Sequence, residues 1–562
     1  MNKKRQDKRH TRFVLKPQWI LVLLVLAALS PFLAKPFNID DPLFIWAARH
    51  IQIQPANPYN FNVNWYGWVQ PMWLITQNPP LICYFIAVCG ATLGWSELAL
   101  HAVFLLPALA VILGTYNLAR RFCNQPFLAA AITLFTPVFL VSSTTLMCDV
   151  MMLVFWVWAV VWWVEGSEQK DVWRLSGAAL FMALAALTKY FGVCLLPLLA
   201  AWSLIGKRRA RGWIGYFVIP LAILISYQVV TYMLYGHNLL LNAYYYTAQS
   251  GVGSHSEHLQ TALTALAFTG GGLAIAALFM LVLYRPRALA PGILISVLAA
   301  TGLCIGASIS KLFSPWSSPM LVVIQIIFWA SGGIGLLVLA VTDYYKRRNA
   351  DSALLGLWVG GTFVFTACLN WTVNGRSILP MSVPIGILVV RQLQEGAGQG
   401  MKVKKRIIAA MVAVGAMLAL SVTRADFLSA KAARQIADRT QAEYGQTNHT
   451  LWFEGHHGFQ YYIEKAGASA LDFRNSRVQW GDYVAIPLNT PNCPLLDESL
   501  VTQQNSILVA GSSWLTTMDV RLGAGFYSSI SGPLPFAFGK VPAAQVLVFS
   551  VTRPTGSIGN TK

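Results

Sequence analysis

An adjacent pair of carboxylates, Asp40 and Asp41, follows the first long apolar run of the chain. Two neighbouring carboxylates repel each other when both are ionised, which raises the pKa of one of them. A carboxylate with a raised pKa suits a general base that removes a proton from an attacking group. Because Pro42 comes next, Asp41 has an alternative role as the N-cap of a short helix over 43–51. That role leaves Asp40 unexplained, and we expect Asp40 to be the base.

Few other acids are expected at the outer ends of apolar helices. The chain has 22 Asp and Glu residues; ten lie beyond residue 424 and six lie in connectors predicted to be cytoplasmic. Asp149 stands at the expected start of an apolar helix, where a carboxylate is costly and therefore a functional candidate. Its alternative role is that of an N-cap. Glu97 and Glu257 are weaker candidates, since Glu97 also marks a helix start and Glu257 lies in a polar loop.

Three basic residues are expected at the outer ends of apolar helices, namely Lys189, Lys311 and Arg376. Cations placed there can stabilise a phosphate that departs in a group-transfer reaction. Each has the alternative of a snorkelling side chain, whose apolar stem lies in the bilayer while its charge reaches water.

The segment 54–73 is rich in asparagine and aromatic residues, among them Asn64, Trp65 and Tyr66. Side-chain amides suit sugar hydroxyls, and aromatic faces suit the C–H surfaces of a sugar ring. The alternative is an aromatic belt at the membrane–water interface. A second predicted outer loop carries His255, which either closes over the site as part of a lid or simply lies at the interface.

The composition indicates what kind of scaffold positions these side chains. Of 562 residues, 56% are hydrophobic and only 11% are charged, whereas soluble domains carry about 25% charged residues. The net charge of +19 is compatible with nucleic-acid binding or with a polytopic membrane protein. Apolar runs of roughly membrane-spanning length fall at 18–34, 97–119, 126–144, 148–164, 173–188, 190–206, 212–234, 259–284, 288–310, 318–342, 352–371, 376–393 and 406–424.

The positions of the basic clusters decide between these two alternatives. With about thirteen transmembrane helices, all the clusters lie on one side of the membrane, and the positive-inside rule makes that side the cytoplasm. We therefore expect a cytoplasmic N-terminus and no nucleic-acid partner. The clusters are the basic residues before position 17 and those at 120–121, 207–211, 285–287, 346–348 and 402–406.

The apolar run 79–94 is too short to be counted among these spans. If it crossed the bilayer, every later basic cluster would change sides, so we predict an interfacial or re-entrant helix. Residues 37–96 then form one long external loop with interfacial helices. Long ordered loops of this kind are usually functional.

The sequence divides into three parts. Residues 1–16 form a basic cytoplasmic segment, and 17–424 form a mainly α-helical membrane domain. Residues 425–562 have ordinary polarity and short strand-like runs, which predict a soluble α/β or α+β domain. The odd number of helices places that domain outside the cytoplasm. It contains His456 and His457 close to Glu454, but no third ligand has diagnostic metal spacing, so we expect packing roles there.

Five short elements, in this order, resemble those of membrane glycosyltransferases that use polyprenyl-phosphate-linked sugars. This is the protein O-mannosyltransferase and aminoarabinose transferase group, which has the GT-C fold. The resemblance covers roughly residues 15–425. The elements are Asp-Asp at 40–41, Asn-Pro-Pro-Leu at 78–81, Asp149, Leu-Thr-Lys-Tyr at 187–190 and Asn-Gly-Arg-Ser-Ile-Leu-Pro at 374–380.

The chain departs from the pattern of this group at two positions. The group often has Lys where this chain has Asn78, and that Lys is thought to hold the donor phosphate. Asn78 lacks the charge, so Lys189, Arg376 or Lys311 must contribute more to phosphate binding here. The acidic pair is Asp-Asp rather than the commoner Asp-Glu.

The resemblance implies transfer of a sugar from a polyprenyl phosphate to a protein hydroxyl, a lipid or a glycan at the outer face of a bacterial inner membrane. Asp40 is then the base, and Asp41 or Asp149 orients the acceptor or the sugar. No cofactor or metal is demanded, although the outer acids are compatible with a divalent ion. The alternatives are a transporter or flippase of lipid-linked sugars and a non-catalytic envelope assembly protein.

Overall fold

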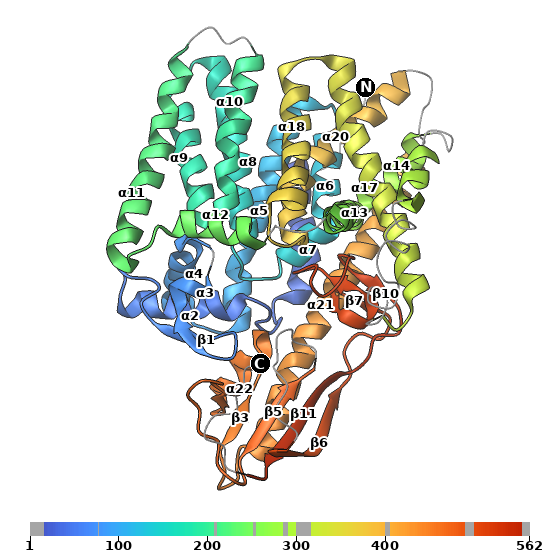
Figure 1. The fold of residues 1–562 in the computed structure, drawn as a ribbon. Coiled ribbons are helices and arrows are strands. Elements are labelled where there is room, and N and C mark those ends of the chain that lie inside the picture. Colours follow the sequence, from blue (N-terminus) through green and yellow to red (C-terminus); the bar gives the residue numbers. More distant parts are fainter. Residues whose placement is uncertain are drawn as a thin grey trace, which may run out of the picture.

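The computed structural model describes residues 16–76, 78–206, 211–250, 255–284, 290–298, 316–398, 405–488 and 499–553. Figure 1 shows a bundle of roughly parallel helices with a strand-containing region at one end. Residues 37–96, predicted to be the first external loop, lie at that same end, between the bundle and the strands. The prediction of a mainly α polytopic protein with a strand-containing C-terminal region is confirmed.

Seven helices in the described part of the chain are long and apolar enough to cross a membrane, or eight if one sharply bent pair is counted as a span. The predicted count of thirteen is not confirmed. The helices of the bundle are α1 (Pro17–Leu29), α5 (Glu97–Phe122), α6 (Pro126–Leu134), α7 (Pro137–Ser142), α8 (Asp149–Gln169), α9 (Val172–Thr188), α10 (Leu195–Ile205), α11 (Val218–Tyr235), α12 (Leu239–Ser250), α13 (His255–Gly272), α14 (Ala274–Leu283), α17 (Pro319–Arg347), α18 (Ala350–Val364), α19 (Gly375–Ile378) and α20 (Ser382–Gly398).

Two predicted spans are broken by their own sequence. The run 126–144 divides into α6 and α7, because Pro137 disfavours a helical conformation for Thr136, whose hydroxyl instead caps α7 by accepting from the Phe139 N–H. The run 259–284 bends by 85° between α13 and α14. That bend follows three consecutive glycines, 270–272, and glycine-containing sequences are common causes of helix kinks.

The first external loop contains helices and a small hairpin. They are α2 (Asp41–Ile53), β1 (Asn62–Asn64), β2 (Val69–Pro71), α3 (Met72–Ile75) and α4 (Leu81–Leu93). Helix α4 is the short apolar segment that we predict to be interfacial. It packs against α2, and the Gln52 side-chain amide donates to the Ala87 carbonyl over 2.9 Å.

Ion pairs join the helix ends at the opposite side of the bundle. Arg121, at the end of α5, pairs with Glu168 at 2.5 Å and with Asp351 at 3.0 Å. The buried Asp343 pairs with Arg391 at 3.2 Å. All the acids predicted in cytoplasmic connectors are paired in this way: Glu165, Glu168, Asp171, Asp343, Asp351 and Glu395.

Helix α21 (Lys405–Tyr444) continues without a break through the predicted boundary at residue 424 and connects the bundle to the strands. Beyond it lies a five-stranded mixed sheet in the order β4-β3-β5-β11-β6, with α22 (His457–Lys465) between β3 and β4. Its strands are β3 (Leu451–Phe453), β4 (Ser469–Ala470), β5 (Tyr483–Pro487), β6 (Val501–Val509) and β11 (Ala544–Val551). Strand β3 is parallel to β4 and β5, and β11 is antiparallel to β5 and β6.

Between β6 and β11 the chain returns to the bundle. This excursion contains β7 (Leu515–Thr516), β8 (Met518–Asp519), β9 (Ala524–Gly525) and β10 (Ala537–Phe538), which pair as two short antiparallel ladders. The Phe526 carbonyl accepts from the N–H of Gly375 over 2.7 Å. A Cβ at Gly375 would lie 2.8 Å from the Phe526 ring, so this close approach requires glycine. The excursion therefore fixes the start of α19, where Arg376 lies.

Candidate active site

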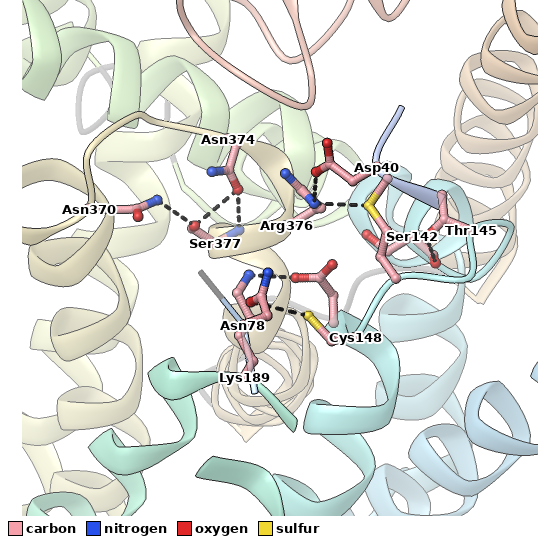
Figure 2. A network of polar contacts seen from close by, with 12 residues as sticks. Asp40, Asn78, Ser142, Thr145, Cys148, Lys189, Asn370, Asn374, Arg376 and Ser377 are labelled. Atoms are coloured by element: carbon pink, nitrogen blue, oxygen red, sulfur yellow. Dashed lines mark hydrogen bonds and ion pairs between the residues drawn. The ribbon is translucent and has the colours of Figure 1, made fainter. Parts of the chain in front are cut away.

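Asp40 lies directly before α2, and its carboxylate pairs with Arg376 at 3.0 Å (Figure 2). The preceding Ile39 has a φ of 52°, which is a strained conformation for a β-branched residue. The turn is fastened to the start of α22, because the Asn38 side-chain oxygen accepts from the N–H of Gly458 over 3.2 Å. Asp40 keeps 28% of its side chain exposed, so an entering group can reach it.

Asp41 has a different environment from its neighbour. It is fully buried, and its two carboxylate oxygens accept from the backbone N–H groups of Asn38 (3.1 Å) and Leu146 (2.8 Å). Burial raises the pKa of Asp41 to about 7, although Lys35 and the two N–H groups oppose the shift. Asp41 is therefore the member of the acidic pair whose pKa is raised. Its carboxylate also connects the external loop to the segment before α8, through the N–H of Leu146.

The predicted N-cap roles of Asp41 and Asp149 are wrong. Each is the first helical residue, and the N-cap positions belong to Asp40 and Cys148, neither of which makes a side-chain capping bond. The carboxylate of Asp41 is used by backbone groups outside its own helix. The carboxylate of Asp149 pairs with Lys189, which follows the end of α9.

Asp149 is buried at the start of α8 and pairs with Lys189 at 2.5 Å. Lys189 follows the last residue of α9, where the chain turns into a short 3₁₀ segment, and its side chain is 18% exposed. The second oxygen of Asp149 has no hydrogen-bond partner among the described residues. The Cys148 thiol lies 3.5 Å from the side-chain oxygen of Asn78, which brings the start of the Asn-Pro-Pro-Leu element to this pair.

Arg376 links the two acid–base pairs. Besides its bond to Asp40, it lies close enough to Asp149 for electrostatic attraction. One guanidinium nitrogen also contacts the Met147 sulfur at 2.9 Å, and the guanidinium lies 5.8 Å from the centre of the Tyr527 ring. Its Nε has no partner among the described residues. The site therefore contains carboxylates and cations in the spatial order Asp40, Arg376, Asp149, Lys189. The Nε–H of Arg376 can still donate a hydrogen bond.

The loop residues proposed to bind a sugar are held against the C-terminal domain. The Asn64 amide donates to the Leu471 carbonyl over 2.9 Å. Trp65 is buried, with its ring centre 5.1 Å from that of His456. Tyr66 is half-buried and near enough to Asp40 for that carboxylate to contribute to raising the pKa of its hydroxyl, after burial as the main cause.

Of the remaining candidates, only Glu97 has a described side chain. Lys311 lies outside the described residues. The same is true of the side chains of His255 and Glu257, although α13 begins at His255. Glu97 starts α5 and pairs with Arg434 of α21 at 3.2 Å, so it connects the bundle to the C-terminal domain.

Sequence reasoning missed a buried group of four residues that supports the site, namely Lys35, Asp426, Thr517 and Tyr527. Asp426 is buried and accepts from Lys35 (2.5 Å), from Thr517 (2.9 Å) and from the hydroxyl of Tyr527 (2.9 Å). Tyr527 in turn contacts Arg376. The change to ordinary polarity after residue 424 predicts a soluble domain there, which leaves Asp426 no place among the acids at helix ends. A usable signal was its position two residues after Arg424, within a continuous helical pattern.

No group of three or more His, Cys, Asp or Glu side chains able to hold a metal ion occurs in the described part of the chain. His456 and His457 contact each other and Trp65 through their rings.

Residues 77–235 match the family model described as dolichyl-phosphate-mannose-protein mannosyltransferase. This match confirms the resemblance stated from the motifs. It covers Asn78, Asp149 and Lys189. Asp40 and Arg376 lie outside it, and the fold brings them to the matched residues. No curated protein matches the chain.

Several solved structures are similar to the chain at low identity. The archaeal oligosaccharyltransferase AglB from Archaeoglobus fulgidus, in complex with an inhibitory peptide and a dolichol-phosphate, is 10% identical over 84% of this chain and 69% of its own, with a TM-score of 0.47. ArnT from Cupriavidus metallidurans, bound to undecaprenyl phosphate, is 14% identical over 84% of this chain and 94% of its own, with a TM-score of 0.43. The arabinofuranosyltransferase AftD from Mycobacteria is 12% identical over 97% of this chain and 42% of its own, with a TM-score of 0.37.

Proposed function

We propose that this protein is a membrane glycosyltransferase that moves a hexosyl or pentosyl unit from a polyprenyl-phosphate donor to an acceptor. One observation carries the proposal. The ion pairs Asp40–Arg376 and Asp149–Lys189 lie together beside the first external loop. The match of residues 77–235 to a mannosyltransferase family supports it. A lipid-linked donor is too apolar to leave the bilayer, so its reaction requires polar groups of this kind at the ends of membrane helices.

The donor phosphate binds between Arg376 and Lys189. A planar guanidinium suits phosphate oxygens through paired N–H donors, and a lysine ammonium adds a compact positive charge. The unpartnered Nε of Arg376 is available for this purpose. Asn78 is neutral, so Lys189 supplies the charge that the family often places at its position, while Asp149 holds that ammonium in place.

Asp40 accepts the proton of the acceptor hydroxyl as its oxygen attacks the anomeric carbon of the sugar. The bond between that carbon and the phosphate oxygen breaks, and polyprenyl phosphate leaves with its charge stabilised by Arg376. Asp41 does not touch the reactants, because backbone groups occupy both of its oxygens. It positions the loop that carries Asp40.

The reaction takes place on the outer face of a bacterial inner membrane, with the N-terminus in the cytoplasm and residues 425–562 outside. The acceptor is a protein hydroxyl, a lipid or a glycan. The basic helix ends and their ion pairs lie at the side of the bundle away from the site, as this orientation requires.

The proposal is tested with the purified protein in lipid vesicles and a polyprenyl phosphate carrying a radiolabelled sugar. We expect the label to leave the lipid fraction and appear on an added envelope extract. A flippase instead moves intact donor across the bilayer without breaking its sugar–phosphate bond. Labelled donor that changes leaflet but remains intact would therefore contradict the transferase.

A further inference from the structure

The excursion between β6 and β11, residues 510–543, leaves the C-terminal sheet at the end that faces the bundle. Val509, the last residue of β6, pairs with Ala544, the first residue of β11, whereas Val501 and Val551 pair at the opposite end of the sheet. Figure 1 shows β7 and β10 at the end of the helix bundle, while the five-stranded sheet extends away from it. The excursion therefore returns the chain to the level of the helix ends.

Helix α17 holds one flank of the excursion. The side chain of Gln325 makes two hydrogen bonds with the backbone of Phe538, since its oxygen accepts from the N–H over 2.7 Å and its amide donates to the carbonyl over 3.1 Å. Further along α17, the ring centre of Trp329 lies 5.3 Å from that of Phe536. The excursion therefore packs along the first part of this helix rather than only touching its end.

These contacts reach the membrane boundary on the side of the strands. Helix α17 has 29 residues, whereas the hydrocarbon layer of a bilayer requires only about 20. Charged residues are costly inside that layer, and the other end of α17 is charged from Asp343 onward. Counting about 20 residues back from Asp343 places the boundary near Val323. Gln325 and Trp329 lie on the hydrocarbon side of it, so the excursion lies at the boundary itself.

Three large apolar side chains of the excursion are exposed. Trp514 is 53% exposed, Val520 49% and Ile530 67%. The ring of Trp514 stacks on that of Phe538 with 5.8 Å between their centres, which places it beside α17. Single exposed apolar side chains are common on proteins. Their position at a membrane boundary, rather than their number, is what indicates a partner.

Ile530 lies at the second flank of the excursion, next to the end of another helix long and apolar enough to cross the membrane. The N–H of the preceding Ser529 donates to the Val373 carbonyl over 2.8 Å. Val373 follows the candidate span that ends at Leu369. Leu369 and Trp371 are themselves 56% and 39% exposed. Apolar exposure thus continues from this helix end onto the excursion.

The exposed cations of the excursion suit a phospholipid surface. Arg521 and Lys540 are both exposed, and the Arg521 carbonyl accepts from the N–H of Ser317, just before α17, over 2.8 Å. Basic side chains at a membrane boundary extend their charge to the lipid headgroups while their stems lie along apolar surface. Tryptophan is enriched at the same boundary.

We infer that the excursion is a membrane-interfacial segment, with Trp514, Val520 and Ile530 inserted among the phospholipids of the leaflet on the side of the candidate site. The partner is the lipid surface itself. The same segment fixes the start of α19 through Gly375, so this lipid contact supports the part of the chain that carries Arg376. The lipid contact goes beyond the proposed transfer reaction and does not depend on it.

Photo-crosslinking of the full-length protein tests this lipid contact. A benzophenone amino acid replaces Trp514, Val520 or Ile530 in separate variants, which are placed in vesicles of phosphatidylethanolamine and phosphatidylglycerol. After irradiation, mass spectrometry identifies the peptides that carry a phospholipid adduct. We expect adducts at all three positions. Because the three side chains are exposed, their replacement leaves the packing of the protein unchanged.

Trp480 is the matched control. It is 68% exposed, and its neighbour Gly481 donates its N–H to the Val551 carbonyl at the end of the sheet away from the bundle. Strand β11 has 8 residues, which separate the two ends of the sheet by about 25 Å. We therefore expect no phospholipid adduct when the benzophenone amino acid replaces Trp480.

Several outcomes would overturn the inference. One is the absence of a phospholipid adduct at any of the three positions of the excursion, and another is an equal yield of adduct at Trp480. Cross-linking of one chain to a second copy, in place of lipid, would make this surface an interface between protein molecules. No sugar transfer is measured, so a failure of the proposed function leaves this result unaffected.

Discussion

The carboxylate of Asp149 is buried away from solvent and pairs with Lys189. Asp149 is 1% exposed and Lys189 is 18% exposed. Removing one partner of a buried ion pair typically costs about 3–5 kcal/mol, since an uncompensated charge remains. Replacing both partners by apolar residues is often neutral. We therefore propose that the pair serves the reaction rather than the stability of the fold.

This gives a prediction for the two residues. Lys189→Met destabilises the protein by about 3–5 kcal/mol, and adding Asp149→Leu restores most of the lost stability. Transfer activity stays abolished in the double variant, because the cation that holds the donor phosphate is absent. Thermal unfolding and sugar transfer, measured on the same preparations, check both parts. A double variant that transfers sugar normally would contradict the role of Lys189.

At the residue scale, the sequence singles out four charged residues that the fold brings together, but it does not indicate how they pair. Asp40, Asp149, Lys189 and Arg376 stand out because charged residues are scarce near apolar helix ends. Their pairing could not be predicted, since Arg376 follows Asp40 by 336 positions and short motifs carry no distance information. The site assignments themselves stay predictions.

At the scale of elements, the turn between β3 and α22 carries a carboxyl whose pKa burial raises from 4.5 to about 8. In the unfolded chain Glu454 ionises near pH 4.5, whereas in the folded protein it stays protonated up to about pH 8. The folded state therefore loses relative stability as pH rises through this window. The loss is complete above about pH 8.

Glu454→Gln removes this titration while keeping the shape of the side chain. We expect the melting temperature of the wild type, relative to the variant, to fall as pH rises from about 5 to 8. Melting curves of both proteins across this range make the measurement. A difference that is constant with pH would show that Glu454 titrates normally.

The excursion between β6 and β11 brings Tyr527 against Arg376, which gives a second prediction at this scale. Tyr527→Phe keeps the ring and loses only the bond to the Asp426 carboxylate, so we expect little change in transfer and about 1.5–3 kcal/mol less stability. Tyr527→Leu also removes the ring beneath the guanidinium. That loss is worth about 1 kcal/mol, or roughly fivefold in transfer rate. Equal rates for the two variants would show that the ring does not position Arg376.

The sequence predicts some helices correctly and misses breaks in others. Helices with long uniform apolar runs, such as α5 and α8, lie where they are predicted. The breaks in 126–144 and 259–284 have local causes, Pro137 and the glycines 270–272, that hydropathy averages conceal. The change of polarity at residue 424 does not predict that α21 continues to Tyr444. A single helix can pass from an apolar to a polar stretch of sequence without a break.

For the whole molecule, the basic clusters and the short α4 predict the orientation. Reporter fusions after residue 95 should report an external location, and fusions after residue 121 a cytoplasmic one. The physical reason is that α5 is long and apolar enough to cross the membrane between them, and the positive-inside rule predicts that Arg121 lies at its cytoplasmic end. A cytoplasmic signal after residue 95 would contradict both the orientation and the interfacial assignment of α4.

The proposed reaction depends on contacts between all three regions of the chain, since the external loop, the bundle and the C-terminal domain each contribute to the surroundings of Asp40. Its carboxylate pairs with Arg376 of the bundle and lies near His456 of the C-terminal domain. Asp40 is therefore the residue whose removal tests the whole arrangement.

The most direct measurement is sugar transfer in vesicles by wild type, Asp40→Asn and the control Asp438→Asn, whose carboxylate is 57% exposed on α21. Loss of the general base lowers the rate by about 10²–10⁴-fold, while binding of polyprenyl phosphate persists and Asp438→Asn remains fully active. Transfer by Asp40→Asn at the wild-type rate would contradict the central claim that Asp40 is the base of a lipid-linked sugar transferase.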